Sequence, residues 1–142
     1  MRTQEILQSK GNKVHSIRSD ATLSQVVQLL VQYDCGSLLV RDGEEVVGII
    51  TERDILRACA TEKRELSQIL VRERMSANLV TATSQDGLDD VMGILTEKRV
   101  RHLPIIDDGQ LAGIISIGDV VKAQHDRLSM ENHFLKTYIH ST

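Results

Sequence analysis

The chain has 142 residues, a length that suits one compact domain with its own core. Hydrophobic residues make up 41% and charged residues 26%, which excludes a disordered chain, and no apolar run reaches the roughly 18 residues that cross a bilayer. The net charge of −3, the pI of about 5.9 and an aromatic content of only 2% exclude a surface built for nucleic acid or an anionic membrane.

The start of the chain and the two cysteines indicate a cellular compartment. Residues 1–11 lack the apolar middle of a signal peptide. Cys35 and Cys59 are the only cysteines and have no CxxC spacing, so we expect two buried thiols under reducing conditions. The expected localisation is therefore cytoplasmic.

The first half of the chain predicts a strand, a helix, a hairpin and a second helix. Apolar residues of the first helix recur at i, i+3, i+4, i+7 and i+8, which is typical of an amphipathic helix. Two short apolar runs around an Asp/Gly turn predict the hairpin. The expected bounds are strand 14–17, helix 21–33, strands 37–40 and 46–51, and helix 52–60.

The second half predicts the same order after a charged helical connector at 60–75. The expected elements are strand 79–82, helix 87–98, strands 102–106 and 111–116, and helix 117–125. Residues 124–142 then predict an amphipathic helix that covers the domain or a second subunit. His125, His133 and His140 could share a face of that helix, but no Cys or carboxylate spacing supports a metal site there.

These two halves form an internal repeat. A shift of 65 residues places 14–58 on 79–123 without a gap, and eleven of the 45 pairs are identical. The chain therefore predicts a first repeat with an N-terminal lead-in at 1–62, a connector and second repeat at 63–123, and a helical tail at 124–142. We expect an α+β fold in which two β-α-β-β-α repeats pack sheet to sheet about a pseudo-twofold axis, because one repeat alone has too small a core.

The repeated phrase is GIITERD at 48–54 and GIISIGD at 113–119. In each copy a strand runs into a helix, with a hydroxyl at the expected N-cap and an Asp three residues later. One interpretation is a helix cap alone, because both groups favour a helix N-terminus. The other adds a ligand: helix N–H groups suit a phosphate, and a carboxylate suits the two vicinal hydroxyls of a ribose. The glycine would let a ligand or a neighbouring strand approach closely.

With RHLPIIDDG before its second copy, the phrase resembles tandem cystathionine-β-synthase (CBS) domains, which form a Bateman module. The resemblance covers about 10–123, and the tail with ENHFLKTYI is similar to a small stand-alone bacterial subgroup. It implies a cleft between the repeats with two pseudo-symmetric sites for AMP, ADP, ATP, NAD or S-adenosylmethionine, and AMP or NAD(H) for that subgroup. No other cofactor is implied as a requirement.

The resemblance also implies roles for individual residues. Asp54 and Asp119 would each hold a ribose, and Thr51 and Ser116 would contact the ribose or phosphate. Arg101 and His102 match the family's phosphate-binding positions, which are the uncharged Gly36 and Ser37 in the first copy, so the two sites are expected to differ. The lead-in strands would supply adenine pockets, with Val14 and His15 serving the Asp119 site and Leu79 and Val80 serving the Asp54 site. The expected ligand-binding set is completed by Ile114 and by Pro104, the only proline, which also suggests a strand edge or bulge.

Three functions remain open from the sequence. The first is a regulatory, non-catalytic sensor that binds an adenine nucleotide and changes shape or assembly, passing the signal to an unknown effector protein. The second is a ligand-independent structural or dimerisation module, and the apolar faces of the tail and post-motif helices predict a homodimer under both readings. The third, a nucleic-acid partner, is disfavoured by the acidic pI. No P-loop or dinucleotide fingerprint is present, and no membrane partner is expected.

Overall fold

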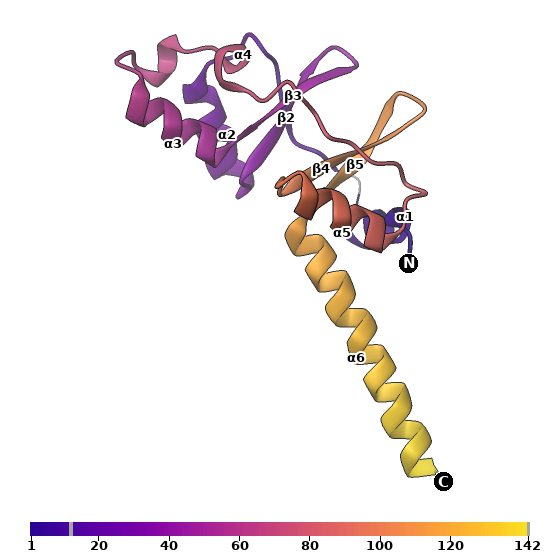
Figure 1. Cartoon of the computed structure of the whole chain (residues 1–142). Helices are drawn as coiled ribbons and strands as arrows, with labels where there is room; N and C mark the ends of the chain where they lie inside the picture. Colours follow the sequence, from indigo (N-terminus) through magenta and orange to yellow (C-terminus); the bar gives the residue numbers. More distant parts are fainter. Residues whose placement is uncertain (12, 142) are drawn as a thin grey trace. The chain divides into compact units, whose positions relative to one another are not determined.

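The computed structural model describes residues 1–11 and 13–141, which form two compact units. The first-half unit comprises Lys13–Val80 and Asp108–Leu111, and the second-half unit comprises Met1–Asn12, Thr81–Asp107 and Ala112–Thr142. No helix within the described ranges is long and apolar enough to cross a membrane. Figure 1 shows the elements of both units, coloured along the chain.

The first-half unit is built on a three-stranded sheet of order β1-β2-β3. Strand β1 is Ser16–Ile17, β2 is Ser37–Asp42 and β3 is Glu45–Thr51. Strand β1 pairs with β2 in parallel and β2 pairs with β3 as an antiparallel hairpin. The helices of this unit are α2 (Leu23–Tyr33), α3 (Glu52–Thr61), the 3-10 turn η1 (Leu66–Gln68) and α4 (Val71–Arg74).

The second-half unit repeats this order with one strand reduced to a single bridge. Its hairpin is β4 (His102–Asp107) and β5 (Gln110–Ser116), and Ala82 bridges to Ile105 in parallel where β1 would be expected. Its helices are α1 (Thr3–Lys10), α5 (Leu88–Glu97) and α6 (Ile117–Ser141). The predicted α+β class with two repeats is therefore confirmed. Pro104 lies in β4, which pairs with β5 on one side and has only the single bridge to Ala82 on the other.

The repeat is also visible in the core, where equivalent positions are buried in both units. The first-half core comes from the apolar face of α2, the inward residues of the hairpin and the start of α3. Each core residue at 17, 23, 26, 30, 38, 40, 50 and 55 has a buried counterpart 65 residues later, namely Ala82, Leu88, Val91, Leu95, Leu103, Ile105, Ile115 and Val120. Two of the identical polar pairs hold each loop to its hairpin. The Ser19 N–H donates to Asp42 Oδ1 at 3.0 Å, and the Ser84 N–H donates to Asp107 Oδ1 at 2.9 Å.

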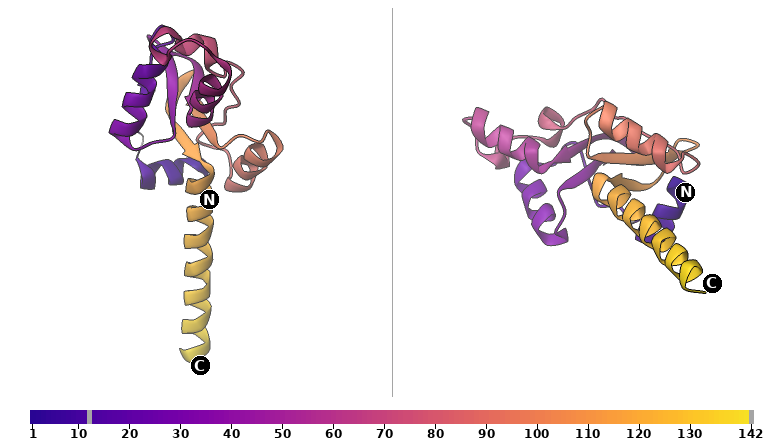
Figure 2. Two further views of the ribbon diagram at one scale, coloured as in Figure 1. Left: turned by 90° about the vertical axis from the view of Figure 1, so that its left-hand side faces the viewer. Right: turned by 60° about the horizontal axis from the view of Figure 1, so that its bottom comes forward.

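Each unit is completed by a segment from the other side of the repeat boundary. In the first-half unit the Leu23 and Val71 N–H groups donate to the carbonyls of Ile69 and Ala21, at 2.9 and 2.8 Å. In the second-half unit the Leu88 N–H donates to Met1 O at 3.0 Å and the Thr3 N–H to Asp86 O at 2.9 Å. The segments that begin at Met1 and Ile69, here called the lead segments, are therefore equivalent, with 1–4 corresponding to 69–72. They are related by a shift of 68 residues, whereas the rest of the repeat is related by a shift of 65. In Figure 2, α1 (indigo) lies beside the start of α6 in both views.

Several boundaries differ from the expectation. Residues 1–11 pack in the second-half unit and residues 63–80 pack in the first-half unit, so the compact units do not follow the expected repeat boundaries. The repeat boundaries at 62/63 and 123/124 stay predictions. The connector is helical only at α3's last residues, η1 and α4, and the tail is not separate but continues α6 as one helix of 25 residues (Figure 1). Helix α1 was not expected. Cys35 is half-buried as a free thiol, but Cys59 is exposed, since it lies on the outer face of α3 beside buried Ala58.

Gly48 and Gly113, the glycines of the repeated phrase, are each packed against a lead segment. A larger residue at either position would collide with that segment. A Cβ at Gly48 would lie 2.8 Å from both Met75 Sδ and the Ser76 carbonyl oxygen. A Cβ at Gly113 would lie 2.6 Å from Leu7 Cδ2. The neighbour at Gly48 is thus partly backbone, whereas the neighbour at Gly113 is a side chain that can rotate.

Gly48→Ala should therefore destabilise the protein more than Gly113→Ala. The new methyl group at 48 must push the Ser76 backbone, and such overpacking costs about 1–3 kcal/mol. At 113 a rotamer change of Leu7 relieves most of the clash. Urea unfolding of the two variants beside the wild type measures the difference, and a larger loss for Gly113→Ala would contradict this account.

Candidate functional site

The first candidate site is the turn where β3 runs into α3. Thr51 is the N-cap, and its Oγ1 accepts from the Asp54 N–H at 3.4 Å. In return Asp54 Oδ2 accepts from the Thr51 N–H at 2.9 Å and from the Thr51 hydroxyl at 3.1 Å. The cap interpretation is therefore correct for this turn. Every described hydrogen bond of the Asp54 carboxylate falls on Oδ2, so the cap uses one of its two oxygens.

The second candidate site is the equivalent turn from β5 into α6. The Ser116 N–H donates to Asp119 Oδ2 at 2.8 Å, and the Asp119 N–H donates to Ser116 Oγ at 3.1 Å. Here a third group joins the cap: Lys10 Nζ, from the end of α1, lies 2.6 Å from Asp119 Oδ2. The same ammonium donates to the Ile114 carbonyl at 2.8 Å. The Lys10 and Asp119 side chains are 33% and 23% exposed, so the pair is partly shielded from water.

The electrostatics of Asp119 follow from these contacts. Burial opposes ionisation of this carboxyl, but the Lys10 ammonium and the Ser116 N–H outweigh that effect and hold its pKa below the usual range. Asp119 is therefore an ionised acceptor at neutral pH. It presents a carboxylate at the N-terminus of a long helix, where N–H groups and the helix dipole favour an anion.

The residues at the two helix starts differ in charge. The Glu52 N–H donates to Gly36 O at 3.0 Å, and the Ile117 N–H donates to Arg101 O at 2.9 Å, so positions 36 and 101 lie at the two helix starts. A Cβ at Gly36 would lie 2.7 Å from Glu52 Oε1, so the Glu52 carboxylate lies over Gly36. The first turn thus carries an added carboxylate, and the second carries Arg101. The surroundings of the two turns therefore differ in charge, and their unequal ligand binding stays a prediction.

The structure brings together part of the predicted set within each unit. Thr51 and Asp54 meet in the first-half unit, and Ile114, Ser116, Asp119 and the backbone of Arg101 meet in the second-half unit. His102 and Pro104 continue β4 away from Arg101, with His102 half-buried and Pro104 buried, and Pro104 O accepts from the Ala82 N–H at 3.1 Å.

The adenine-pocket residues were expected inside strands at 14–17 and 79–82, but they precede the pairing that forms, because β1 begins at Ser16 and only Ala82 bridges in the second half. Val14, His15, Leu79 and Val80 are all half-buried, and the His15 carbonyl accepts from the Leu39 N–H at 3.2 Å. The His15 ring stacks on Tyr33, with ring centroids 3.8 Å apart and planes 9° apart, so one face of the imidazole is covered. Their contact with an adenine ring stays a prediction.

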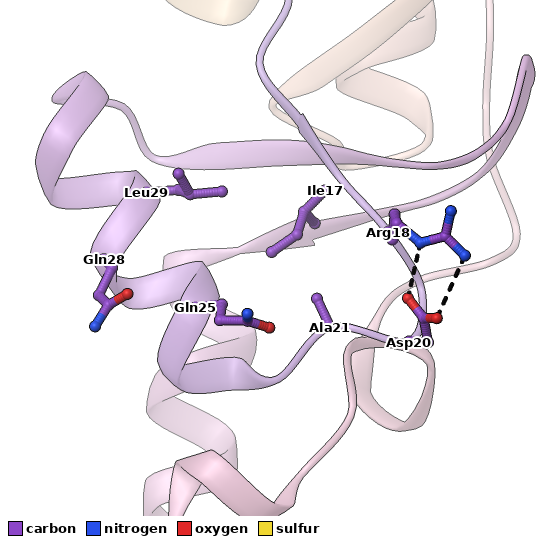
Figure 3. Close-up of a pocket in the computed structure, with 7 residues that line it drawn as sticks. All are labelled: Ile17, Arg18, Asp20, Ala21, Gln25, Gln28 and Leu29. Carbon is purple, nitrogen blue, oxygen red and sulfur yellow. Dashed lines mark hydrogen bonds and ion pairs between the residues drawn. The ribbon is translucent and has the colours of Figure 1, made fainter.

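A hollow of about 470 Å³ lies elsewhere in the first-half unit, against α2 (Figure 3). Its lining includes Ile17, Gln25 and Leu29, and none of the predicted site residues belongs to it. Arg18 and Asp20 at its rim bond to each other at 3.0 and 3.3 Å, so their charges neutralise each other. Within the described residues no group of three His, Cys, Asp or Glu side chains could hold a metal ion. The two strand-to-helix turns therefore stay the candidate site.

Lys10 is the site residue that sequence reasoning missed. It lies outside the ungapped match of 14–58 with 79–123, and its helix aligns with the connector only at the shift of 68. The signal that could have found it is Leu7, which corresponds to Met75 at that shift and packs on the equivalent glycine.

Comparison with known proteins gives the same two repeats. The family model for the CBS domain matches residues 6–61 and 68–126. The chain is 33% identical over 144 residues to the mitochondrial CBS domain-containing protein CBSX3 of Arabidopsis thaliana, covering 95% of this chain and 70% of that protein. The crystal structure of the CBS-domain containing protein ATU1752 from Agrobacterium tumefaciens superposes with a TM-score of 0.83 at 36% identity, over 87% of this chain and 99% of that one. The CBS domain pair of protein MJ0100, solved with 5′-methylthioadenosine and S-adenosyl-L-methionine, has the same fold, with a TM-score of 0.79 at 22% identity over 89% and 98% of the two chains.

Removing the Lys10 charge should raise the pKa of Asp119. The ionised carboxylate is stabilised in the folded state, so its contribution to stability is present above the unfolded-state pKa, near 3.8, and is lost as pH falls through the lower folded-state value. In Lys10→Met that contribution is smaller, and its loss is complete at a higher pH. Carboxyl NMR titration of Asp119 measures the shift. Asp107, whose pKa is lowered by bonds from Ser84, is the internal control and should not move.

Proposed function

Because this chain belongs to the CBS-domain family as a tandem pair, we propose that it is a regulatory sensor for an adenine nucleotide and not an enzyme. One observation carries the proposal: the two units present the same carboxylate, hydroxyl and helix N-terminus at equivalent turns. At each turn one oxygen of the Asp carboxylate serves the cap, and the other faces no described hydrogen-bond donor. A ribose diol supplies two donors to such a carboxylate, and an adjoining phosphate suits the helix N-terminus.

The charge difference supports unequal use of the two turns. Lys10 and Arg101 stand at the Asp119 turn, whereas Glu52 stands at the Asp54 turn. A phosphate is therefore favoured at Asp119. The Asp54 turn is better suited to the nucleoside part of a ligand or to an uncharged adenosine compound. The ligands of MJ0100 are adenosine compounds without a phosphate group, which makes them a useful second class to test beside AMP, ATP and NADH.

Calorimetric titration of the full chain with AMP tests the sensor. We expect Asp119→Ala to weaken AMP binding at least about tenfold, which corresponds to the loss of one charge-assisted contact. Asp54→Ala should have a smaller effect on AMP. Asp89→Ala, an exposed carboxylate in the first turn of α5, is the control with the same change of charge and should bind as the wild type does.

Two results would reject the sensor. One is that AMP, ATP, NADH and 5′-methylthioadenosine all fail to bind the wild type below millimolar concentration. The other is that neither Asp variant differs from Asp89→Ala.

A second function, dimerisation without a ligand, is favoured by one specific observation on α6. Val121, Leu128 and Leu135 recur every seven residues along this helix and are 52%, 60% and 58% exposed. A seven-residue apolar repeat is typical of a helix that pairs with another helix. We propose that a second copy of the chain covers this stripe, so that assembly is the output of the sensor or, if no nucleotide binds, the function itself.

The double variant Leu128→Glu/Leu135→Glu should then sediment as a monomer, because two carboxylates on the stripe oppose its burial. Met130→Glu, an exposed change outside the seven-residue repeat, is the matched control and should keep the wild-type mass. A wild type that is monomeric at all concentrations would reject the dimer. Repeating the runs with and without AMP separates a ligand-driven assembly from a constitutive one.

A further inference from the structure

The contact between Lys10 and Asp119 has no counterpart in the other unit. In the first-half unit the carbonyl of Ile49 accepts from the Ser76 N–H at 2.9 Å. The equivalent carbonyl of Ile114 accepts instead from Lys10 Nζ at 2.8 Å. A backbone N–H is thus sufficient to satisfy this carbonyl, as Ser76 demonstrates. By the shift of 68 that relates the lead segments, Lys10 corresponds to the uncharged Asn78.

The positive charge is therefore an addition specific to the Asp119 turn. It lies 2.6 Å from the carboxylate that would hold the ribose, and the helix start beside it is bonded to the backbone of Arg101. The Lys10 side chain is 33% exposed and its ammonium contacts Asp119, so bulk water screens this charge less than it screens that of a fully exposed lysine.

A ribose diol bound to both carboxylate oxygens would compete with Lys10. Asp119 Oδ2 already accepts from the Ser116 N–H and from Lys10, which fills its two lone-pair directions. The Ser116 N–H is fixed by the start of α6, whereas the Lys10 side chain can rotate. A diol therefore displaces Lys10, and the displaced ammonium needs another anion nearby.

We propose that Lys10 makes the Asp119 site select phosphorylated nucleosides. When such a ligand binds, the Lys10 ammonium leaves the Asp119 carboxylate and pairs with the phosphate of the ligand. This inference rests on the proposed sensor function. A nucleoside without phosphate must displace Lys10 with no compensating contact. A nucleotide restores an ion pair to the ammonium, so the same lysine disfavours adenosine and favours AMP.

Titrations of AMP and adenosine into Lys10→Met test this inference, in an Asp54→Ala background that removes the other turn. Methionine keeps the aliphatic stem and removes the charge. We expect AMP affinity to fall about tenfold while adenosine binding is unchanged or tighter, since a charge-assisted contact is lost for AMP alone. Lys10→Gln should behave as Lys10→Met does, and Lys10→Arg should keep the preference for AMP. Lys63→Met, an exposed lysine of the first-half unit, controls for net charge.

The outcomes separate this inference from the sensor proposal. If the wild type and Asp54→Ala bind neither compound, the role of Lys10 is wrong, and the sensor is wrong too if ATP, NADH and 5′-methylthioadenosine also fail to bind. If they bind AMP but Lys10→Met and Lys10→Gln weaken AMP and adenosine equally, or leave AMP unchanged, the sensor stands and the role of Lys10 is wrong. Circular dichroism and thermal melting of each variant establish that the compared proteins are folded.

Discussion

The start of a helix directly after a strand is the constraint on which the site depends. The first N–H groups of such a helix have no partner inside the helix, and a hydroxyl and a carboxylate three residues apart satisfy them. In both units this fixes the Asp side chain against its own backbone, with Oδ2 as the acceptor. The cap and the proposed ribose contact are therefore compatible, because the cap orients the carboxylate that a ligand would use.

The two turns share this construction and differ in what surrounds it. The lead segment reaches each unit through the same backbone hydrogen bonds but then diverges. In one unit it turns extended and pairs Ser76 with Ile49, and in the other it continues as α1 and delivers Lys10. Duplication thus preserved the helix start, while the segment before it made one site positively charged. The proposed sensor, with two unequal sites, would respond to more than one adenosine compound.

Much of this organisation could be predicted from the sequence, because the same hydrophobic and turn pattern occurs in both repeats. The helix period, the Asp/Gly turns and the eleven identical pairs gave the hairpins, α2, α3 and α5 nearly to the residue, and the role of Thr51 and Asp54 as a cap followed from their spacing. Helix α1 and Lys10 could not be predicted. Their hydrophobic pattern is short, with only Ile6 and Leu7 buried as apolar residues, and their register is shifted by three residues from the rest of the repeat. The unit in which each lead segment packs is decided by tertiary contacts, which a local hydrophobic pattern does not encode.

The unbroken helix α6 connects the Asp119 turn to residues far from it. The helix that begins beside Ser116 runs for 25 residues without a break, which corresponds to about 37 Å at the rise of an α-helix. Its first turn contains Asp119, and its exposed apolar stripe runs from Val121 to Leu135. A tilt of about 10° at the cap would carry the far end through about 6 Å, more than one helical turn. A tilt of α6 that is too small to disturb the core could thus change which surfaces pack together near the C-terminal end of this helix.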